Sequence, residues 1–457
     1  MEFDDLPPEV VLKIFSNLSQ CFLEVIARVS QRWMKLAFDP SLYTVVCIDS
    51  GHNENPQRVQ KILERASMLR TLQITADAAS FDVVAASSTG LRLLNCLEIP
   101  GSSLSHRAMP AILEQCKSLK TIKLRGRHRL TKSDVRMLEM LPSLKTVVTT
   151  NFLDITDEIL HQLCSSCRRL ESLKIRTEHI YREESFGYLK SLHHLRDLSV
   201  DVITTTMLVH VSKSCPSLET LEISMVWDDY DISMAEALEG FLHLKSLSVY
   251  KDCGREQGWL HRRFRAPPLL ERFDVDSLII REQQWHQLIV SFKETLRHLH
   301  ITVTMVPDHS LRLLSSCKKI ESLSMAGLKG KTTVFSLLSQ LPKLHRASLH
   351  VVTHSADAVY ELMSIVDTKD KSPRGKTRLV FRVWCSHPPT RGQIKLAAYA
   401  FKNYLASNTS MTAQHIQEFE HQCSTFSEGS SLPKNLETSL PTMSSTLKYL
   451  TLTLNGV

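Results

Sequence analysis

The sequence predicts an α/β fold in which a small N-terminal three-helix segment precedes a long solenoid of strand–helix repeats. One observation is an apolar pattern, Leu-x-x-Leu-x-Leu with other apolar residues allowed, that recurs along most of the chain. A second is that residues 6–43 carry short apolar stripes at helical spacing. Each repeat has an apolar face that it cannot bury alone, so stacking is expected to give a horseshoe with parallel strands on its concave face and helices on its convex face.

The recurrence is regular. The first apolar residue of each pattern, here named the repeat lead, returns every 23 to 26 residues between positions 69 and 344. This spacing lies within the range of about 20–29 residues that is typical of leucine-rich repeats. The later part of each pattern alternates like a half-buried strand, and segments such as 109–119, 157–167 and 334–341 have helical spacing. The leads are Leu69, Leu94, Leu119, Leu144, Leu170, Leu195, Leu218, Leu244, Leu270, Leu296, Ile320 and Leu344.

The two ends of the solenoid are less regular. Tyr43, Val46 and Ile48 have the repeat spacing and stand 26 residues before the lead Leu69, so they predict a first half-repeat. We therefore divide the chain into residues 1–43, repeats of about 25 residues over 44–355, and atypical closing repeats over 356–457. Terminal repeats are commonly irregular because they must cap the core.

Within the C-terminal part, three predictions can be made from the pattern. A helix is expected over 356–366 and a strand over 379–384, and Leu450 and Leu452 restore the repeat near the end. Residues 422–445 are rich in Ser and Thr and are predicted to be a mobile insertion.

The N-terminal segment carries a specific set of motifs. Leu6-Pro7 opens it, Val11, Ile14, Phe15 and Leu18 form a helical stripe, and Val29-Ser30-Gln31-Arg32-Trp33 follows. Pro suits the first turn of a helix, where a missing amide donor costs little. Three helices in some forty residues make a small core, and an apolar stripe on such a unit is a natural docking face for a helical partner.

This segment resembles an F-box. The resemblance implies that it binds a Skp-family adaptor and, through it, a cullin–RING scaffold. Position by position, it implies adaptor contacts for Leu6, Pro7, Ile14, Phe15, Leu18, Val29 and Trp33. One departure is that Cys21-Phe22-Leu23 stands where family members often have an Asp before the second helix, and we expect Ser19 to cap that helix instead.

The cysteines follow the repeat. Cys116, Cys167, Cys215 and Cys317 each stand three residues before a lead, which resembles the cysteine-containing repeats typical of F-box proteins. The Cys164-x-x-Cys167 motif lacks the second ligand pair that a structural zinc site needs. We expect packed, reduced thiols and no metal.

Substrate binding is expected on the inner strand face and on two loops. Lys123, Arg125, Lys174 and Arg176 make the early inner face basic, and acidic residues follow on later strands. A face with both signs of charge suits a polar peptide or a folded protein. After two neighbouring strands come loops rich in residue types that dominate binding hot spots. The candidates there are Trp227, Tyr230, Tyr250 and Trp259.

Composition excludes several classes. The 457 residues carry a mild net charge of +7 without a concentrated basic stripe, so no nucleic-acid partner is expected. No long charge-free apolar window occurs, and the start Met1-Glu2-Phe3 is unlike a secretory signal, so no membrane partner is expected. These features favour a cytoplasmic and/or nuclear location, where cysteines stay reduced.

Three functions remain to be weighed. The resemblance implies a substrate-recognition subunit of a Skp–cullin–F-box ubiquitin ligase, without a cofactor. The alternative is a leucine-rich-repeat scaffold that binds proteins but has no ligase role. An enzyme is not expected, because no spare domain supplies a base for Cys253, and the chain has no Gly-rich phosphate loop, HExxH motif or nucleophile elbow.

Overall fold

The computed structural model describes most of the chain up to residue 353 and two later strands. The described ranges are 6–48, 56–75, 78–87, 91–126, 129–152, 155–177, 181–227, 234–250, 266–276, 282–306, 312–328, 340–344, 346–353, 378–385 and 450–456. The chain divides into two compact units. Unit 1 comprises Met1–Ile203 and Lys213–Leu218, and unit 2 comprises Thr204–Ser212 and Glu219–Val457.

Unit 1 begins with the three predicted helices, α1 (Pro8–Phe15), α2 (Gln20–Ile26) and α3 (Gln31–Ala37), and a 3-10 turn, η2 (Pro40–Tyr43). Pro8 occupies the first helical position of α1, as expected for a residue without an amide donor. The hydroxyl of Ser30 caps α3 by accepting a hydrogen bond from the Trp33 N–H at 3.1 Å. The small core of this segment contains Val11, Phe15, Leu23 and Ala37.

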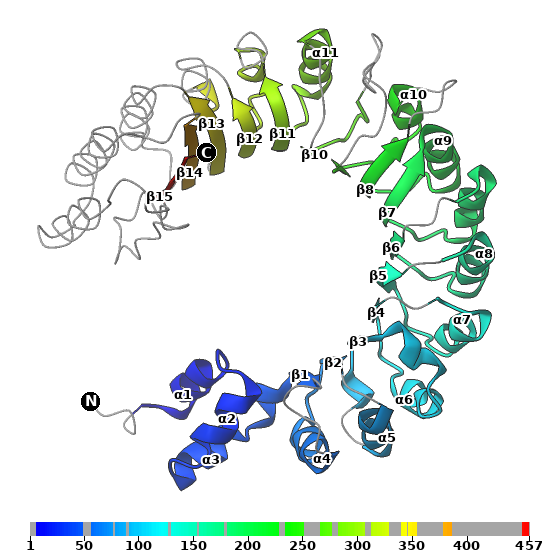
Figure 1. Ribbon diagram of the computed structural model, residues 1–457, viewed down its shortest axis with the longest axis vertical. Helices are drawn as coiled ribbons and strands as arrows, with labels where there is room; N and C mark the ends of the chain where they lie inside the picture. Colours follow the sequence, from blue (N-terminus) through cyan, green and yellow to red (C-terminus); the bar gives the residue numbers. More distant parts are fainter. Residues whose placement is uncertain are drawn as a thin grey trace, which may run out of the picture. The chain divides into compact units, whose positions relative to one another are not determined.

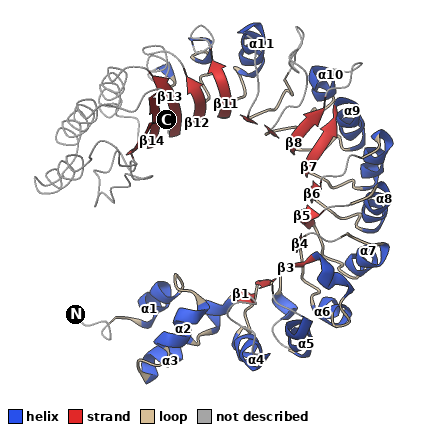
Figure 2. Cartoon of the chain, in the orientation of Figure 1, coloured by secondary structure: helices blue, strands red, loops and turns tan. Residues whose placement is uncertain are grey.

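The repeats of unit 1 follow. Its strands pair in parallel and in chain order, with helices on the side away from the inner strand face (Figures 1 and 2). The strands are β1 (Val45–Ile48), β2 (Thr71–Ile74), β3 (Cys96–Pro100), β4 (Thr121–Arg125), β5 (Thr146–Phe152), β6 (Ser172–Thr177) and β7 (Asp197–Thr204). The helices are α4 (Pro56–Arg65), α5 (Ala78–Ala86), η3 (Leu91–Leu93), η4 (Gly101–Ser105), α6 (Met109–Gln115), α7 (Lys132–Glu139), α8 (Asp157–Ser166) and η5 (Glu183–Ser191).

Unit 2 continues the same architecture. It contains α9 (Thr205–Ser214), whose last two residues belong to unit 1, α10 (Met234–Glu239) and α11 (Glu282–Phe292). From β8 onward the strands again pair in parallel and in chain order. They are β8 (Thr220–Trp227), β9 (Ser246–Val249), β10 (Arg272–Asp276), β11 (His298–Val306), β12 (Ser322–Leu328), β13 (Arg346–Thr353), β14 (Arg378–Cys385) and β15 (Leu450–Gly456).

The predicted repeat positions form the core. The leads Leu119 and Leu170 are fully buried, as are the strand residues Leu72 and Ile122. Removing one such leucine from water contributes about 1.5–3 kcal/mol, so the twelve leads alone are a large part of the driving force for stacking. The predicted half-repeat is confirmed, because Val46 of β1 is buried and pairs in register with Leu72 of β2.

Two positions depart from a uniform repeat. Thr149 occupies a position where other repeats have an aliphatic residue, and its buried hydroxyl donates to the Lys174 carbonyl oxygen at 3.3 Å. The pairing of β5 with β6 shifts register just beyond Thr149. Gly126, directly after β4, has φ +97°, a conformation that side-chain-bearing residues rarely adopt.

At the C-terminal end, the strand predicted over 379–384 is confirmed as β14, and the restored repeat is confirmed as β15. These two strands pair in register from Leu379 with Leu450 to Cys385 with Gly456. The helices predicted over 334–341 and 356–366 and the insertion predicted over 422–445 lie wholly or mainly outside the described residues.

Candidate protein-binding surfaces

The N-terminal helices expose apolar side chains that the repeats bury. Phe22 is 62% exposed, Val25 60% and Val29 62%, and they stand at i, i+3 and i+7 along α2 and the turn after it. Val10 and Ile14 stand at i and i+4 on α1 and are 43% and 39% exposed. Exposed stripes of this kind at helical spacing are suited to helix-mediated protein contacts.

The seven residues predicted to touch an adaptor differ in exposure. Ile14, Val29 and Pro7 are exposed, and Leu6, Leu18 and Trp33 are half-buried. Phe15 is 1% exposed and packs edge-to-face against Trp33, with ring centroids 5.8 Å apart. Phe15 therefore holds α1 against α3 from within, and in this structure it offers no surface to a partner.

Phe22 and Val25 were missed at the sequence level. Their signal was present, because Phe22, Val25 and Val29 have the spacing of one helix face. The expected cap is also absent: Ser19 is the N-cap residue of α2, but its side chain makes no capping hydrogen bond.

The N-terminal helices are joined directly to the first repeat. Arg58 of α4 forms an ion pair with Glu24 of α2, with Nη2 and Oε2 2.8 Å apart. The side-chain amide of Gln20 donates to the Val45 carbonyl oxygen at 3.1 Å. Tyr43, 1% exposed, donates its hydroxyl proton to the Ala37 carbonyl oxygen at 3.1 Å, and burial raises its pKa. Because these contacts cross from helices to repeat without a linker, the two parts form one packed structure.

The inner face of unit 1 holds the four predicted basic residues, and they are partly neutralised. The pairing of β3 with β4 puts Glu98 opposite Lys123. Glu98 is only 5% exposed and forms ion pairs with Lys123, at 3.6 Å between Oε2 and Nζ, and with Arg125. A buried carboxylate that lost both cations would be strongly destabilising. Lys123 and Arg125 therefore also stabilise the fold.

The second basic pair lies on β6. Arg176 is paired with Asp201 of β7, with Nη1 and Oδ1 3.1 Å apart. Lys174 lies two strands from Lys123 in the same row, with Val148 between them. Lys123, Arg125 and Arg176 are thus in ion pairs with Glu98 or Asp201, so the net positive charge of the predicted basic face is smaller than the count of Lys and Arg implies.

The family comparison adds to this geometry. Residues 3–49 match the F-box-like family. The match spans α1 to α3 and ends just after β1, and beyond it the strand–helix repeat continues through both units. The chain is an F-box and leucine-rich-repeat protein.

Solved structures with related architecture have low similarity to this F-box protein. The mouse RP105/MD-1 complex gives 13% identity and a TM-score of 0.42, covering 76% of this chain and 68% of that one. LegL7 from Legionella pneumophila, a leucine-rich-repeat-containing protein, gives 11% identity and a TM-score of 0.37, covering 66% of this chain and 93% of that one. The Drosophila Toll–Spatzle complex gives 12% identity and a TM-score of 0.33, covering 72% of this chain and 42% of that one. At such TM-scores these likenesses carry no weight, and the fold of this F-box protein is taken from its own strand pairing.

The aromatic loops proposed in unit 2 are described only in part. Trp227 ends β8, and nothing is described of its side chain, while Tyr230 and Trp259 lie outside the described residues, as does Cys253. Tyr250 follows β9, is 39% exposed and donates its N–H to the Ile223 carbonyl oxygen at 3.0 Å. A joint aromatic site therefore stays a prediction.

The described cysteines of this F-box protein are all free thiols. Burial raises the pKa of Cys116, Cys167 and Cys215 to about 12 each, and of Cys317 to about 11. These thiols stay protonated at neutral pH and pack as small apolar groups. Within the described ranges, no cluster of His, Cys, Asp and Glu has a metal-binding arrangement. No described helix combines the length and apolar character needed to cross a membrane.

Proposed function

We propose that this protein is the substrate-recognition subunit of a Skp–cullin–F-box ubiquitin ligase. The observation that carries the proposal is the F-box-like match over residues 3–49 together with the exposed apolar stripe of Phe22, Val25 and Val29. A Skp-family adaptor would cover this stripe and link the chain to a cullin–RING scaffold. Exposed apolar side chains on such a small helical unit gain most from a partner that removes them from water.

The mechanism requires no catalytic group from this chain. The F-box fixes the receptor to the ligase, and the repeats hold a target protein close to the ubiquitin-charged enzyme. Holding both reactants in one assembly raises their effective concentration. The contacts of Arg58, Gln20 and Tyr43 at the joint favour this role, because they keep the first repeats in a fixed position relative to the F-box.

The target would contact the inner strand face and the loops of unit 2. The proposed contacts are Lys123, Arg125, Lys174, Arg176, Trp227, Tyr230, Tyr250 and Trp259. The free thiols of the described cysteines agree with a reducing compartment, and we infer a cytoplasmic and/or nuclear location.

The proposal is tested by co-purification with a Skp-family adaptor. A Phe22→Glu/Val29→Glu variant places two charges on the exposed stripe without emptying the core, so it should fold and lose the adaptor. Leu242→Glu is the matched control, because Leu242 is 60% exposed in unit 2 and lies outside the F-box. The control should retain the adaptor.

Two outcomes would decide against the ligase role. In the first, the wild-type chain captures no Skp-family adaptor; in the second, the doubly charged variant captures the adaptor as well as the wild type does. Either result would favour the leucine-rich-repeat scaffold. If the adaptor does bind, an F-box-deleted form should retain targets whose ubiquitination then falls.

A further inference from the structure

The residue that directly follows each repeat lead forms a row along the edge where the strands begin. In unit 2 this row alternates in charge. Lys245 pairs with Glu219 at 2.8 Å between Nζ and Oε2. Arg297 pairs with Glu271 at 3.7 Å between Nε and Oε2, and with Glu321 at 2.6 Å between Nη1 and Oε1. These charges neutralise one another from strand to strand.

The same row in unit 1 is unbalanced. Its residues from the third to the sixth lead are Lys120, Lys145, Glu171 and Arg196. Their backbones are direct neighbours, since the last three N–H groups each donate to the carbonyl oxygen of the preceding residue in the row at 2.8 Å. Lys145 and Glu171 form an ion pair within the row, at 2.6 Å between Nζ and Oε1. With three basic residues and one acidic residue, these four positions have a surplus of positive charge.

The turns before these leads add to the surplus. Lys117, Arg168 and Arg169 are exposed there. The turns lie side by side: the Ser143 hydroxyl donates to the Lys117 carbonyl oxygen at 2.9 Å, and Arg169 Nη1 donates to the Pro142 carbonyl oxygen at 3.0 Å. We name Lys117, Lys120, Lys145, Arg168, Arg169 and Arg196 the basic rim. Glu139 at the cavity and Glu171 in the row are acidic residues that lie among these six basic side chains.

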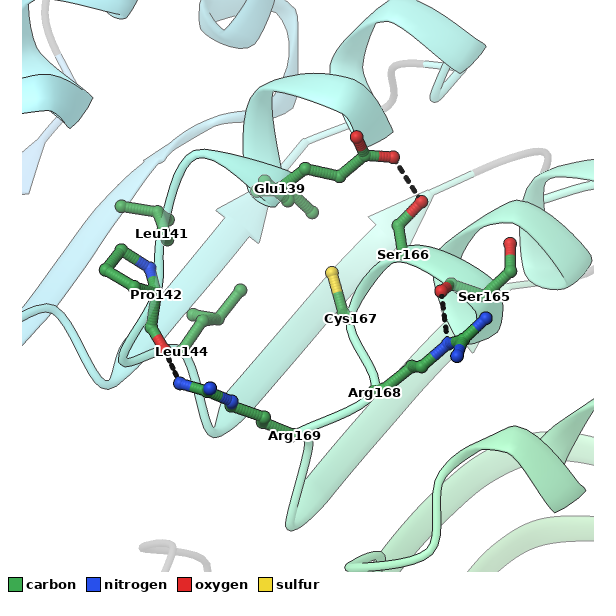
Figure 3. A pocket seen from close by; sticks show the side chains of 10 residues that line it. Glu139, Leu141, Pro142, Leu144, Ser165, Ser166, Cys167, Arg168 and Arg169 are labelled. Carbon is green, nitrogen blue, oxygen red and sulfur yellow. Dashed lines mark hydrogen bonds between the residues drawn. The ribbon is translucent and has the colours of Figure 1, made fainter.

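A cavity of about 360 Å³ opens beside the rim (Figure 3). It lies between the turn after α7 and the end of α8, and the apolar side chains that line it are Leu138, Leu141, Pro142 and Leu144. Ser165, Ser166 and Glu139 also line it, and the Glu139 carboxylate accepts a hydrogen bond from the Ser166 hydroxyl. Cys167 also lines it, and because burial raises the pKa of this thiol to about 12, it is a neutral part of the wall. The volume is at the lower end of the range for ligand pockets, about 300–1,000 Å³.

Arg168 and Arg169 lie at the cavity with part of their donor capacity in use. Arg168 Nε donates to the Ser165 carbonyl oxygen at 3.1 Å, and Arg169 donates to Pro142 (Figure 3). A guanidinium has five N–H donors. Each exposed side chain therefore keeps further donors for a carboxylate, while its existing bond holds it in place at reduced entropic cost.

We propose that the basic rim and this cavity together bind an acidic linear segment of a partner protein, with one apolar side chain in the cavity and flanking carboxylates on the rim. Charge complementarity selects the acidic segment. Neighbouring strands are about 4.8 Å apart, so the row from Lys120 to Arg196 spans about 14 Å, the length of four or five extended residues. This site lies on the edge of the sheet, apart from the inner-face residues Lys123 and Arg176, and it does not depend on the ligase role.

A nucleic acid is the less suitable occupant. Single strands are held by a basic groove together with aromatic side chains on which bases stack. No aromatic residue lines the cavity. The leucine and proline side chains on one wall of the cavity fit an aliphatic side chain better.

The test uses the full-length protein and a fluorescein-labelled decapeptide in which one leucine is flanked by aspartates and glutamates. Fluorescence anisotropy should show binding that weakens as sodium chloride rises from about 50 to 200 mM, because salt screens exposed charges. Replacing the peptide's leucine by serine should weaken binding about tenfold or more, since the cavity would lose its apolar occupant.

The chain offers a closely matched pair of variants. Arg168 and Arg169 stand between Cys167 and a lead, and Lys318 and Lys319 stand between Cys317 and a lead in unit 2. Arg168→Glu/Arg169→Glu should weaken peptide binding by about tenfold or more, and Lys318→Glu/Lys319→Glu should leave it unchanged. Thermal unfolding would show that both variants are folded.

The inference is overturned if the two double variants weaken binding equally, if serine replaces the peptide's leucine without loss, or if a single-stranded RNA oligonucleotide of equal charge binds more tightly than the peptide. Adaptor capture, measured in parallel, is expected to be unaffected by Arg168→Glu/Arg169→Glu. The two proposals can therefore fail separately.

Discussion

The F-box exposes many of its large apolar side chains to solvent, whereas the repeats bury most of theirs. Among the described residues, six of the thirteen large apolar side chains that are clearly exposed lie between positions 10 and 34. In the repeats, leads such as Leu119 and Leu170 are fully buried. The repeats complete their core by stacking on one another, whereas the F-box, with three short helices, cannot cover its own surface. The difference indicates where the chain itself is incomplete and a partner adds most.

Truncating an apolar side chain should give the largest difference in stability between the repeats and the F-box. Leu119→Ala removes a fully buried side chain from the repeat core, and we expect it to lower the free energy of unfolding by about 2–5 kcal/mol. Phe22→Ala in the F-box should change it by less than about 0.5 kcal/mol, because the side chain is already mostly in water. Urea unfolding followed by circular dichroism measures both. A similar loss for the two variants would mean that Phe22 belongs to the core.

The buried thiols should give the next largest contrast. Because burial raises the pKa of Cys116 and Cys167 from 9.0 to about 12, their thiolate fraction at about pH 8 falls about a thousandfold. Cys47 of β1 is exposed and should be alkylated by iodoacetamide before Cys116 and Cys167. Timed labelling and mass spectrometry read out each site, and urea serves as the control that exposes all thiols. Rapid native labelling of Cys116 would contradict the packing described.

Truncating a residue at a helix N-terminus should destabilise the repeats more than the F-box. Asp134, fully buried, accepts hydrogen bonds from the Thr131 N–H at 2.8 Å and the Ser105 hydroxyl at 2.7 Å, and completes a capping box on α7. Asp134→Ala should cost about 1–3 kcal/mol of stability. Ser19→Ala in the F-box should cost under about 0.5 kcal/mol, since Ser19 makes no cap bond. Equal costs in thermal unfolding would show that Ser19 does cap α2.

The surface charges of the repeats should matter least to stability. The hydrogen bond from Lys145 lowers the pKa of Glu171, so this pair stabilises the fold above the ordinary Glu pKa of 4.5, and the contribution is lost as pH falls below it. Lys145→Ala should raise the Glu171 pKa toward its usual value, as followed by carboxyl NMR titration, with only a slight change in acid unfolding. An unchanged pKa would mean that the pair does not form in solution.

The fold could be predicted from the sequence because its period is encoded locally. Each lead repeats the same spacing, so burial of Leu119 and even the half-repeat at Tyr43 followed from counting. The same counting also contained the register: Glu98 and Lys123 both stand four residues after a lead, which places them side by side. Their ion pair is a contact between neighbouring strands, so it follows from the period only when two repeats are aligned.

Other features of the surfaces required the structure. The burial of Phe15 against Trp33 depends on how α1 meets α3, and helical spacing alone does not say which of two apolar stripes faces inward. The cavity beside Arg168 depends on how the turn at Pro142 packs against the end of α8. The residue types in the turn at Pro142 and at the end of α8 do not by themselves predict a cavity.

Under the proposed ligase role, the contacts between the F-box and the first repeats would influence which lysines of a target are modified. A receptor with a flexible tether lets its cargo search a volume, and many lysines can be reached in turn. Here Arg58, Gln20 and Tyr43 leave no tether between the F-box and the first repeats. A target held on those repeats would present the same side to the ligase each time. The choice of lysine would then follow from the pose of the bound target, and a substrate could escape modification by lacking a lysine on that side.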